Sequence, residues 1–204
     1  MSTPVSGYSF VARFLHWTMA LLVIVMLVVG FAMVQSGLPK PIQGILYVLH
    51  KNTGILIMAL VVLRFVWRKI DPPPPLPDSV PRWQQAIADF NHGALYLLLF
   101  LMPLLGYVRV KAADLPIESL DALGIQPLVA PSEPLAKLAS TLHLAGALAL
   151  AALVALHLLA AFYHGAIRRD GVYSRMRWGR GRRPAPAGRA RTSLSNSPQS
   201  APGA

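Results

Sequence analysis

Four long apolar stretches dominate the sequence and restrict what the chain can fold into. They run over about residues 12–35, 45–68, 87–110 and 138–166. Each is longer than the roughly 20 residues that an α-helix needs to cross a hydrocarbon core about 30 Å thick. Backbone amides cannot stay unpaired in lipid, so each stretch is expected to be helical. The pattern predicts an all-α membrane protein, a bundle of four transmembrane helices.

The composition fits this prediction. Hydrophobic residues make up 54% of the chain and charged residues only 13%, whereas about a quarter of a soluble domain is charged. Cysteine is absent, which excludes disulfides, iron–sulfur clusters and thiolate metal sites. The first stretch lacks the short apolar core and small-residue cleavage site of a signal peptide, and three more stretches follow it. It is therefore expected to be a retained helix.

The segments between and after the apolar stretches have a different character. Residues 111–137 form the longest connection, and their mixed pattern permits a short surface helix. Residues 179–204 contain few large apolar side chains and are expected to form a disordered cytoplasmic tail. We expect residues 1–178 to form the four-helix domain.

The distribution of basic residues predicts the orientation in the membrane. An even number of spans places both termini on one side, and that side carries fourteen of the nineteen Lys and Arg residues. The positive-inside rule then places both termini in the cytoplasm. The net charge of +11 is thus mainly a topology signal and a means of contacting the anionic headgroups of the bilayer. A nucleic-acid partner is not expected.

The six histidines are concentrated in the apolar stretches. All of them fall inside or at the edge of a predicted span, and none lies in a loop or in the tail: His16, His50, His92, His143, His157 and His164. Ionisable residues in a membrane are costly, usually face the bundle interior and usually have a function. Six such residues together point to a functional site more than to interfacial side chains.

The spacing of two histidines in the fourth stretch suggests what that site is. His143 and His157 are fourteen residues apart, which is a rise of about 21 Å with a residual rotation of roughly 40°. One helix face thus offers an imidazole to each leaflet. His50 is expected at the level of His143, and His16 at that of His157. Opposed imidazoles in a helix bundle form an axial haem site, so two stacked haems are predicted, with these four histidines as iron ligands.

Directly coordinated zinc or iron is a less favoured alternative. Compact metal sites usually add carboxylates or thiolates to histidine. Asp89 is the only acidic residue within a predicted span, and it sits at the edge. The small residues around the histidines of the fourth stretch leave room for a cofactor, and they equally permit close helix contact in lipid.

Several stretches resemble the bacterial cytochrome b561 family, four-helix dihaem b proteins of the inner membrane. They are RFLHWTMALLV (13–23), HKNTGILIMALVVLRFVWR (50–68), HGALYLLLFLMPLLGY (92–107) and HLAGALALAALVALHLLAAFYHGAIRRDGVYSRM (143–176). The resemblance covers most of residues 8–176. It implies two b haems and the same pairing, His16 with His157 and His50 with His143. It also implies that His92 and His164 match histidines that are not usually axial ligands, and that they line the cytoplasmic haem, its propionates or a quinone site.

The resemblance implies electron transfer across the membrane. One kind of family member is a superoxide oxidase, which takes electrons from superoxide at the periplasmic face and delivers them to ubiquinone. We therefore expect an oxidoreductase that takes electrons from superoxide or another one-electron donor and passes them to the quinone pool. The alternative is a haem b anchor subunit that passes electrons between a partner dehydrogenase or hydrogenase and the quinone pool. A haem-free four-helix transporter is a third possibility.

Further residues are expected to serve the two ends of this path. Lys51, Arg109 and Lys111 are expected to attract superoxide at the outer side, although the acidic residues of that side nearly balance its cations, and the three could simply mark the membrane boundary. On the cytoplasmic side, the candidates for haem propionates or lipid phosphates are Arg13, Arg64 and Arg68. The candidates for lining a quinone site are His92, His164 and Trp17.

Overall fold

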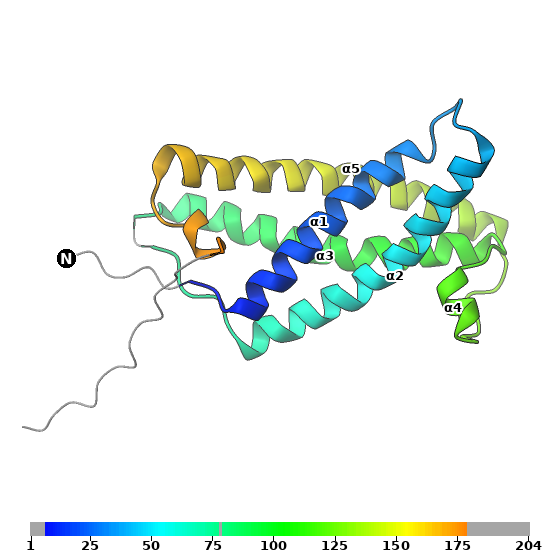
Figure 1. Ribbon diagram of the computed structural model, residues 1–204, viewed down its shortest axis with the longest axis horizontal. Coiled ribbons are helices and arrows are strands. Elements are labelled where there is room, and N and C mark those ends of the chain that lie inside the picture. The colour runs from blue at the N-terminus through cyan, green and yellow to red at the C-terminus, as the bar shows by residue number, and fades with distance from the viewer. Residues whose placement is uncertain (1–6, 78, 179–204) are drawn as a thin grey trace, which may run out of the picture.

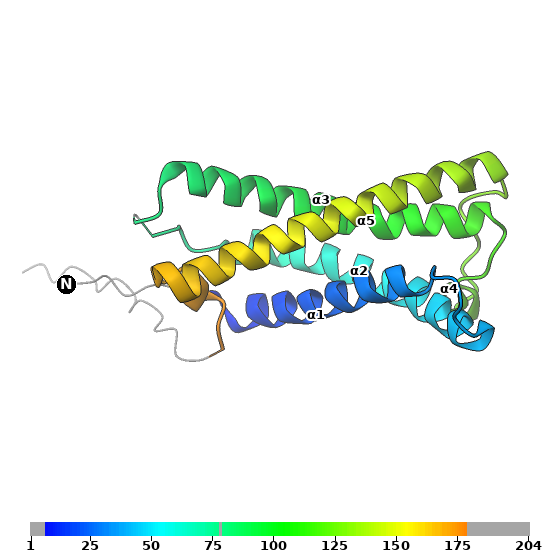
Figure 2. The same ribbon diagram turned by 90° about the horizontal axis from the view of Figure 1, so that it is seen from above.

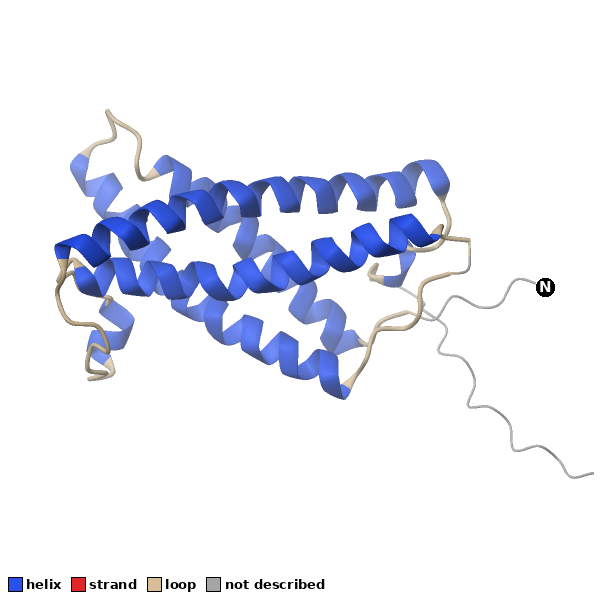
Figure 3. Cartoon of the chain, turned by 180° about the vertical axis from the view of Figure 1, so that it is seen from behind, coloured by secondary structure: helices blue, strands red, loops and turns tan. Residues whose placement is uncertain are grey.

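The chain folds as an elongated bundle of four long helices. The computed structural model describes residues 7–77 and 79–178. The long helices are α1 (Phe10–Ala32), α2 (Lys40–Ile70), α3 (Arg82–Ala112) and α5 (Glu133–Phe162) (Figure 1). All four are long and apolar enough to cross a membrane, and no strand occurs in the two described ranges (Figure 3). The prediction of an all-α, four-span membrane protein is confirmed.

Each long helix begins a few residues before the apolar stretch that predicted it, and in α1 and α5 a serine side chain caps the first turn. The Ser9 hydroxyl accepts a hydrogen bond from the Ala12 amide at 3.3 Å and begins α1. The Ser132 hydroxyl does the same for the Leu135 amide at 3.4 Å in α5. Proline also occupies the first turn of α2 and of α5, where its missing N–H is tolerated.

The four helices form two packed pairs. α1 lies along α2, and α3 lies along α5, as the two perpendicular views show (Figures 1 and 2). α2 also packs against α3 and connects the pairs. Helices of different pairs therefore face each other across the middle of the bundle, which is where a ligand shared by both pairs can lie.

Two clusters of apolar side chains pack in the middle of the bundle, and many other large apolar side chains face outward. One buried cluster contains Met19, Ile57 and Val61, and a second contains Val23, Met102 and Leu150. Leu150 is halfway along α5 between His143 and His157, so this packing separates the levels of those two histidines. Many large apolar residues of all four long helices are exposed, as expected for surfaces that contact lipid.

The two ends of the bundle differ, and we call them the termini end and the loop end. At the termini end α1 begins, and α5 continues as a π-helical turn, η1 (Tyr163–Arg168), followed by a short 3₁₀ turn, η2 (Tyr173–Arg175). The following residues close this end, since Trp17 Nε1 donates to the Met176 carbonyl at 2.8 Å. At the loop end, the segment 111–137 contains the short helix α4 (Glu118–Ala122). The predicted tail, 179–204, lies outside the described residues.

Candidate functional site

Two pairs of histidines face each other between the helix pairs. The ring centres of His16 on α1 and His157 on α5 are 6.0 Å apart, with an angle of 74° between the ring planes. The ring centres of His50 on α2 and His143 on α5 are 6.1 Å apart, also at 74°. α5 thus contributes one histidine to each pair, and the α1/α2 pair supplies both partners.

Glycines make room for the histidines of the pair at the loop end. A Cβ atom at Gly30 on α1 would lie 2.9 Å from Cε1 of His50, and one at Gly106 on α3 would lie 3.3 Å from Cε1 of His143. Within each packed helix pair, a glycine of one helix therefore accommodates the imidazole of its neighbour. Both rings consequently turn toward the middle of the bundle, where they line one cavity.

That cavity is large enough for a cofactor. Its volume is about 900 Å³, near the upper end of the roughly 300–1,000 Å³ typical of ligand sites. Its walls come from all four long helices and from the segment before α4. The Nδ1 atom of His50 is buried there and has no hydrogen-bond partner among the described residues. Buried polar atoms normally have a partner, so this ring is suited to a bound group.

The donor set and its spacing fit an iron porphyrin. Imidazole nitrogens bind first-row metal ions at about 2.0–2.1 Å, so two rings that share one ion have centres roughly 6 Å apart. Both observed separations, 6.0 and 6.1 Å, match this value. Across the described residues, no cluster of three or more His, Cys, Asp or Glu side chains could hold a bare metal ion. A porphyrin needs only two axial protein ligands, because its four nitrogens supply the others.

A third histidine adjoins the pair at the termini end. His92 on α3 has its ring centre 5.4 Å from that of His157. This distance is shorter than both matched separations, and the loop-end pair has no equivalent neighbour among the described histidines. Geometry therefore favours His16 over His92 as the partner of His157.

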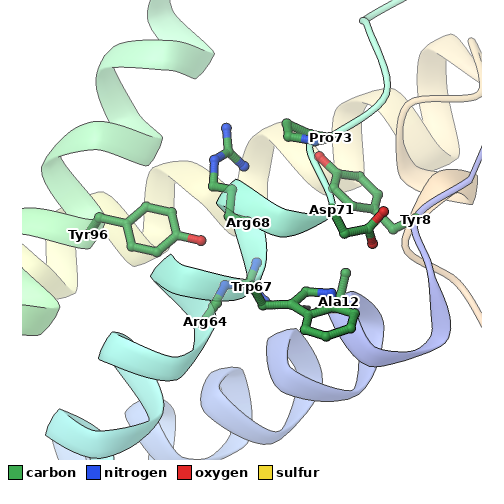
Figure 4. Close-up of a pocket in the computed structure, with 8 residues that line it drawn as sticks. All are labelled: Tyr8, Ala12, Arg64, Trp67, Arg68, Asp71, Pro73 and Tyr96. Carbon is green, nitrogen blue, oxygen red and sulfur yellow. Dashed lines mark hydrogen bonds between the residues drawn. The ribbon is translucent and has the colours of Figure 1, made fainter.

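Two of the expected arginines, both on α2, lie beside an aromatic ring near the termini end. The guanidinium groups of Arg64 and Arg68 lie 6.0 and 5.9 Å from the centre of the Tyr96 ring. Figure 4 shows all three beside a cavity of about 20 Å³, which also touches Trp67 and Asp71; this is room for about one water molecule. The site can hold a small polar group between its cations.

The other two expected residues of this end are tied to the returning chain. Arg13 donates to the Arg177 carbonyl at 3.3 Å, and its guanidinium lies 5.9 Å from the Trp178 ring centre. The Trp17 ring centre lies 5.3 Å from that of His16. Because its Nε1 is bonded to the Met176 carbonyl, Trp17 shields His16 and has no free donor for a quinone.

The three expected cations of the loop end do not behave alike. Lys51 Nζ lies 2.7 Å from a Glu118 carboxylate oxygen, and Lys111 Nζ lies 2.8 Å from one of Asp121. Both lysine side chains are largely buried, and their charges are balanced. Arg109 lines the large cavity and has no carboxylate within ion-pair distance in the described part of the chain. Of the three, Arg109 offers the most available positive charge.

Glu118 fastens α4 to α2 through several hydrogen bonds. Besides Lys51, it accepts from Asn52 Nδ2 at 2.7 Å, while Asn52 Oδ1 accepts from the Ser119 amide at 2.7 Å. Partial burial raises the pKa of Glu118, but the hydrogen bonds from Lys51, its own backbone amide and Asn52 outweigh that effect. The pKa of Glu118 therefore lies below its ordinary value of 4.5. These contacts hold α4 over the loop end while the Glu118 carboxylate is charged.

His164 forms a pair with an acidic residue that the sequence did not single out. Its Nδ1 lies 2.6 Å from Oδ2 of Asp170, whose side chain is 6% exposed. Other partners that sequence reasoning missed are Tyr96, Gly30, Gly106 and the two loop carboxylates. Their spacing in the sequence does not indicate these contacts. Only for Asp170 is there a local clue, because it follows His164 by six residues.

The fold and its two matched histidine pairs define a class: multi-pass membrane proteins built to hold haem between transmembrane helices. Residues 7–179 match the family model described as prokaryotic cytochrome b561. The chain is 34% identical to "Cytochrome b561 homolog 2" of Escherichia coli K12 over 176 residues, covering 86% of this chain and 93% of that protein. It is 28% identical to "Cytochrome b561 homolog 1" of the same organism over 127 residues, covering 62% of this chain and 72% of that protein. The chain belongs to the prokaryotic cytochrome b561 family, whose members bind haem b and transfer electrons in the membrane.

Proposed function

We propose that this protein takes electrons from superoxide at the loop end and delivers them to ubiquinone at the termini end. Two superoxide ions lose one electron each and leave as O₂, and one ubiquinone gains two electrons and two protons to become ubiquinol. The two histidine levels would each hold a b haem, and these would carry electrons between the two reactions. The loop end faces the periplasm and both termini face the cytoplasm of a bacterial inner membrane, in accord with the distribution of Lys and Arg.

The observation that carries the proposal is the matched geometry of the two histidine pairs. Their separations differ by only 0.1 Å and their ring angles are equal, although they involve different helices. Equivalent sites at two depths on one helix favour a relay across the membrane over a single binding site. Haem b, when bound, supplies a one-electron carrier.

The protein's own residues favour electron transfer over oxygen chemistry. Each site would offer two imidazoles to a haem iron, and such ligation would suit one-electron transfer better than binding of O₂. His16 and His157 would hold the haem at the termini end (the inner haem), and His50 and His143 would hold the one at the loop end (the outer haem). The apolar cluster that contains Val23 and Leu150 lies between the two levels, and Arg64 and Arg68 would pair with carboxylates of the haem at the termini end.

At the loop end, Arg109 contributes more to the attraction of superoxide than Lys51 and Lys111 do. Superoxide is an anion, and a cation that lines a low-dielectric cleft raises its rate of encounter. Lys51 and Lys111 instead hold Glu118 and Asp121 at the cavity rim, and they contribute mainly by keeping α4 in place. We assign the steering role to Arg109 and supporting roles to the two lysines.

The acceptor side needs an apolar approach and a proton carrier. Exposed Phe162 and Ile167 flank His164 along the chain at the end of α5, so ubiquinone can approach from the lipid. His164 is the proton carrier in this proposal, and His92 lies beside His157 at the same end.

Purified protein tests the proposal without a partner. Reduction with dithionite should give a sharp b-type absorption band with two haems per chain. A superoxide-generating system should then reduce a short-chain ubiquinone, and superoxide dismutase should abolish this reduction. Two haems that accept no electrons from superoxide, but do accept them from an added dehydrogenase or hydrogenase, would support the anchor function instead. Absence of any haem would overturn both.

A further inference from the structure

The end of α5 has an irregular backbone that brings an acidic side chain back onto His164. The helix widens into the π-helical turn Tyr163–Arg168, a feature often found at functional sites. Arg169 then adopts a left-handed conformation with φ of 51°, which is costly for a residue with a side chain. These two departures from regular helix reverse the chain and place Asp170 beside His164.

Asp170 is fixed in this position by several contacts. Its Oδ2 lies 2.6 Å from His164 Nδ1, and its Oδ1 accepts from the Val172 amide at 3.3 Å. Arg168 Nε lies 4.0 Å from the same Oδ2. The Asp170 side chain is 6% exposed and that of His164 is 13% exposed. A nearly buried carboxylate that contacts one imidazole nitrogen fixes both the tautomer and the orientation of the ring.

Because Nδ1 of His164 contacts Asp170, Nε2 is the ring nitrogen that is left to exchange a proton. An ionised carboxylate only accepts hydrogen bonds, so His164 donates Nδ1–H to Asp170. Nε2 is then the nitrogen that can gain and lose a proton. A carboxylate paired in this way stabilises the imidazolium that forms without being protonated itself. The dyad lies at the termini end, seven residues beyond His157 along the chain.

We propose that Asp170 is a positioning residue that makes His164 the proton donor to ubiquinone, a role that rests on the proposed function. The N–H bond at His164 Nε2 breaks and an O–H bond forms on a quinone carbonyl oxygen. The imidazole then regains a proton from water on the side of the termini, and the cycle repeats for the second oxygen. Both electrons come from superoxide at the loop end. Asp170 keeps its contact with His164 Nδ1 throughout.

The test compares an acceptor that needs protons with one that does not. Haem-loaded protein in detergent is reduced with dithionite, freed of excess reductant and mixed anaerobically with short-chain ubiquinone or with ferricyanide. Ferricyanide takes an electron without a proton. Asp170→Asn should slow the limiting rate of reoxidation by ubiquinone about 10- to 100-fold, as for loss of a residue that orients a functional histidine. The half-saturating quinone concentration and the ferricyanide rate should not change.

Further variants keep the test decisive. His164→Gln should show the same selective loss, and Asp170→Glu should recover part of the rate. Asp114→Asn, an exposed carboxylate at the loop end, is the matched control and should behave as wild type. If Asp170→Asn does not retain haem, the comparison rests on His164→Gln and Asp170→Glu.

The possible failures are separable. Wild-type protein that reduces ferricyanide but not ubiquinone would overturn the proposed quinone reduction and this inference with it. Wild-type protein that reduces ubiquinone, with His164→Gln and Asp170→Asn equally fast, would overturn only the role of the dyad. An equal loss with both acceptors would mean that Asp170 only maintains the structure.

Discussion

Gly30 and His50 lie on neighbouring helices so close together that no side chain fits between them. A Cβ at position 30 would lie 2.9 Å from His50 Cε1, a separation that real Cβ contacts do not show. The position of the His50 ring therefore requires a residue without a side chain at position 30, in addition to the helix that carries His50. Gly106 and His143 are related in a similar but less strict way, because a Cβ at position 106 would lie 3.3 Å from His143 Cε1, a tight contact that a small shift could relieve.

Gly30→Ala should remove the outer haem. The added methyl group displaces the His50 ring from its place opposite His143, and that pair loses its ligand spacing. Haem content per chain should fall from two to one, measured by the reduced-minus-oxidised spectrum. Gly44→Ala, on α2 with nothing within 4 Å of the added Cβ, is the control, and it should keep both haems because Ala is favoured over Gly in helices by about 1 kcal/mol. Retention of two unchanged haems in Gly30→Ala would show that the ring does not need this space.

Single histidine substitutions should sort the ligands into two sets. His50→Ala and His143→Ala should remove the same haem, and His16→Ala and His157→Ala should remove the other, as measured by haem stoichiometry and by the band that is lost. His92→Ala should retain both haems, since its ring lies 5.4 Å from that of His157, nearer than the 6.0 and 6.1 Å of the two matched pairs. Loss of a haem in His92→Ala but not in His16→Ala would reverse the assignment at the termini end.

The sequence predicted the helices and the levels of the histidines because both follow from local periodicity. Apolar length defines the spans, and a spacing of fourteen residues places His143 and His157 on one face of α5. Which of His16 and His92 adjoins His157 at the matched distance depends on how the helices pair. That is a tertiary property, and in the structure both do adjoin it.

The ion pairs of the loop-end lysines could not be predicted from the sequence either. Counting charges places Lys51 among available cations, but folding of the segment around α4 brings Glu118 to it across 67 residues of sequence. Likewise, no propensity predicts the π-helical turn and left-handed Arg169 that bring Asp170 to His164. Irregular backbone of this kind is determined by tertiary contacts and is concentrated at functional sites.

Arg109→Ala should slow the reaction with superoxide. Loss of the unbalanced cation removes electrostatic attraction at the cavity, so the second-order rate constant for haem reduction should fall roughly tenfold at low ionic strength. The difference should shrink as salt screens the charge. Pulse radiolysis or stopped-flow mixing measures the rate constant. Lys40→Ala, an exposed cation at the same end, is the control, and an equal effect of both substitutions would indicate a general charge effect without local steering.

Acid should release α4. The pKa of Glu118 is lowered on folding, so its contribution to stability is complete above its ordinary value of 4.5 and is lost as the pH falls through the lower folded-state value. Hydrogen-exchange protection of residues 115–122, corrected for intrinsic rates, should therefore persist at pH 5 and decline below 4.5. Glu118→Gln should weaken protection already at neutral pH and flatten its pH dependence. Equal protection of this variant and wild type at neutral pH would show that α4 is held by its apolar contacts alone.

Reporter fusions should place the loop end in the periplasm. Alkaline phosphatase folds to an active enzyme only after export, so a fusion after Leu128, in the segment between α4 and α5, should be active. A fusion after Trp178, beyond η2, should be inactive, because nine Lys and Arg residues that precede this point on the side of the termini oppose its export. Green fluorescent protein fused at the same two points should give the reverse pattern. Activity of alkaline phosphatase at Trp178 together with inactivity at Leu128 would invert the orientation, and superoxide would then have to be oxidised in the cytoplasm.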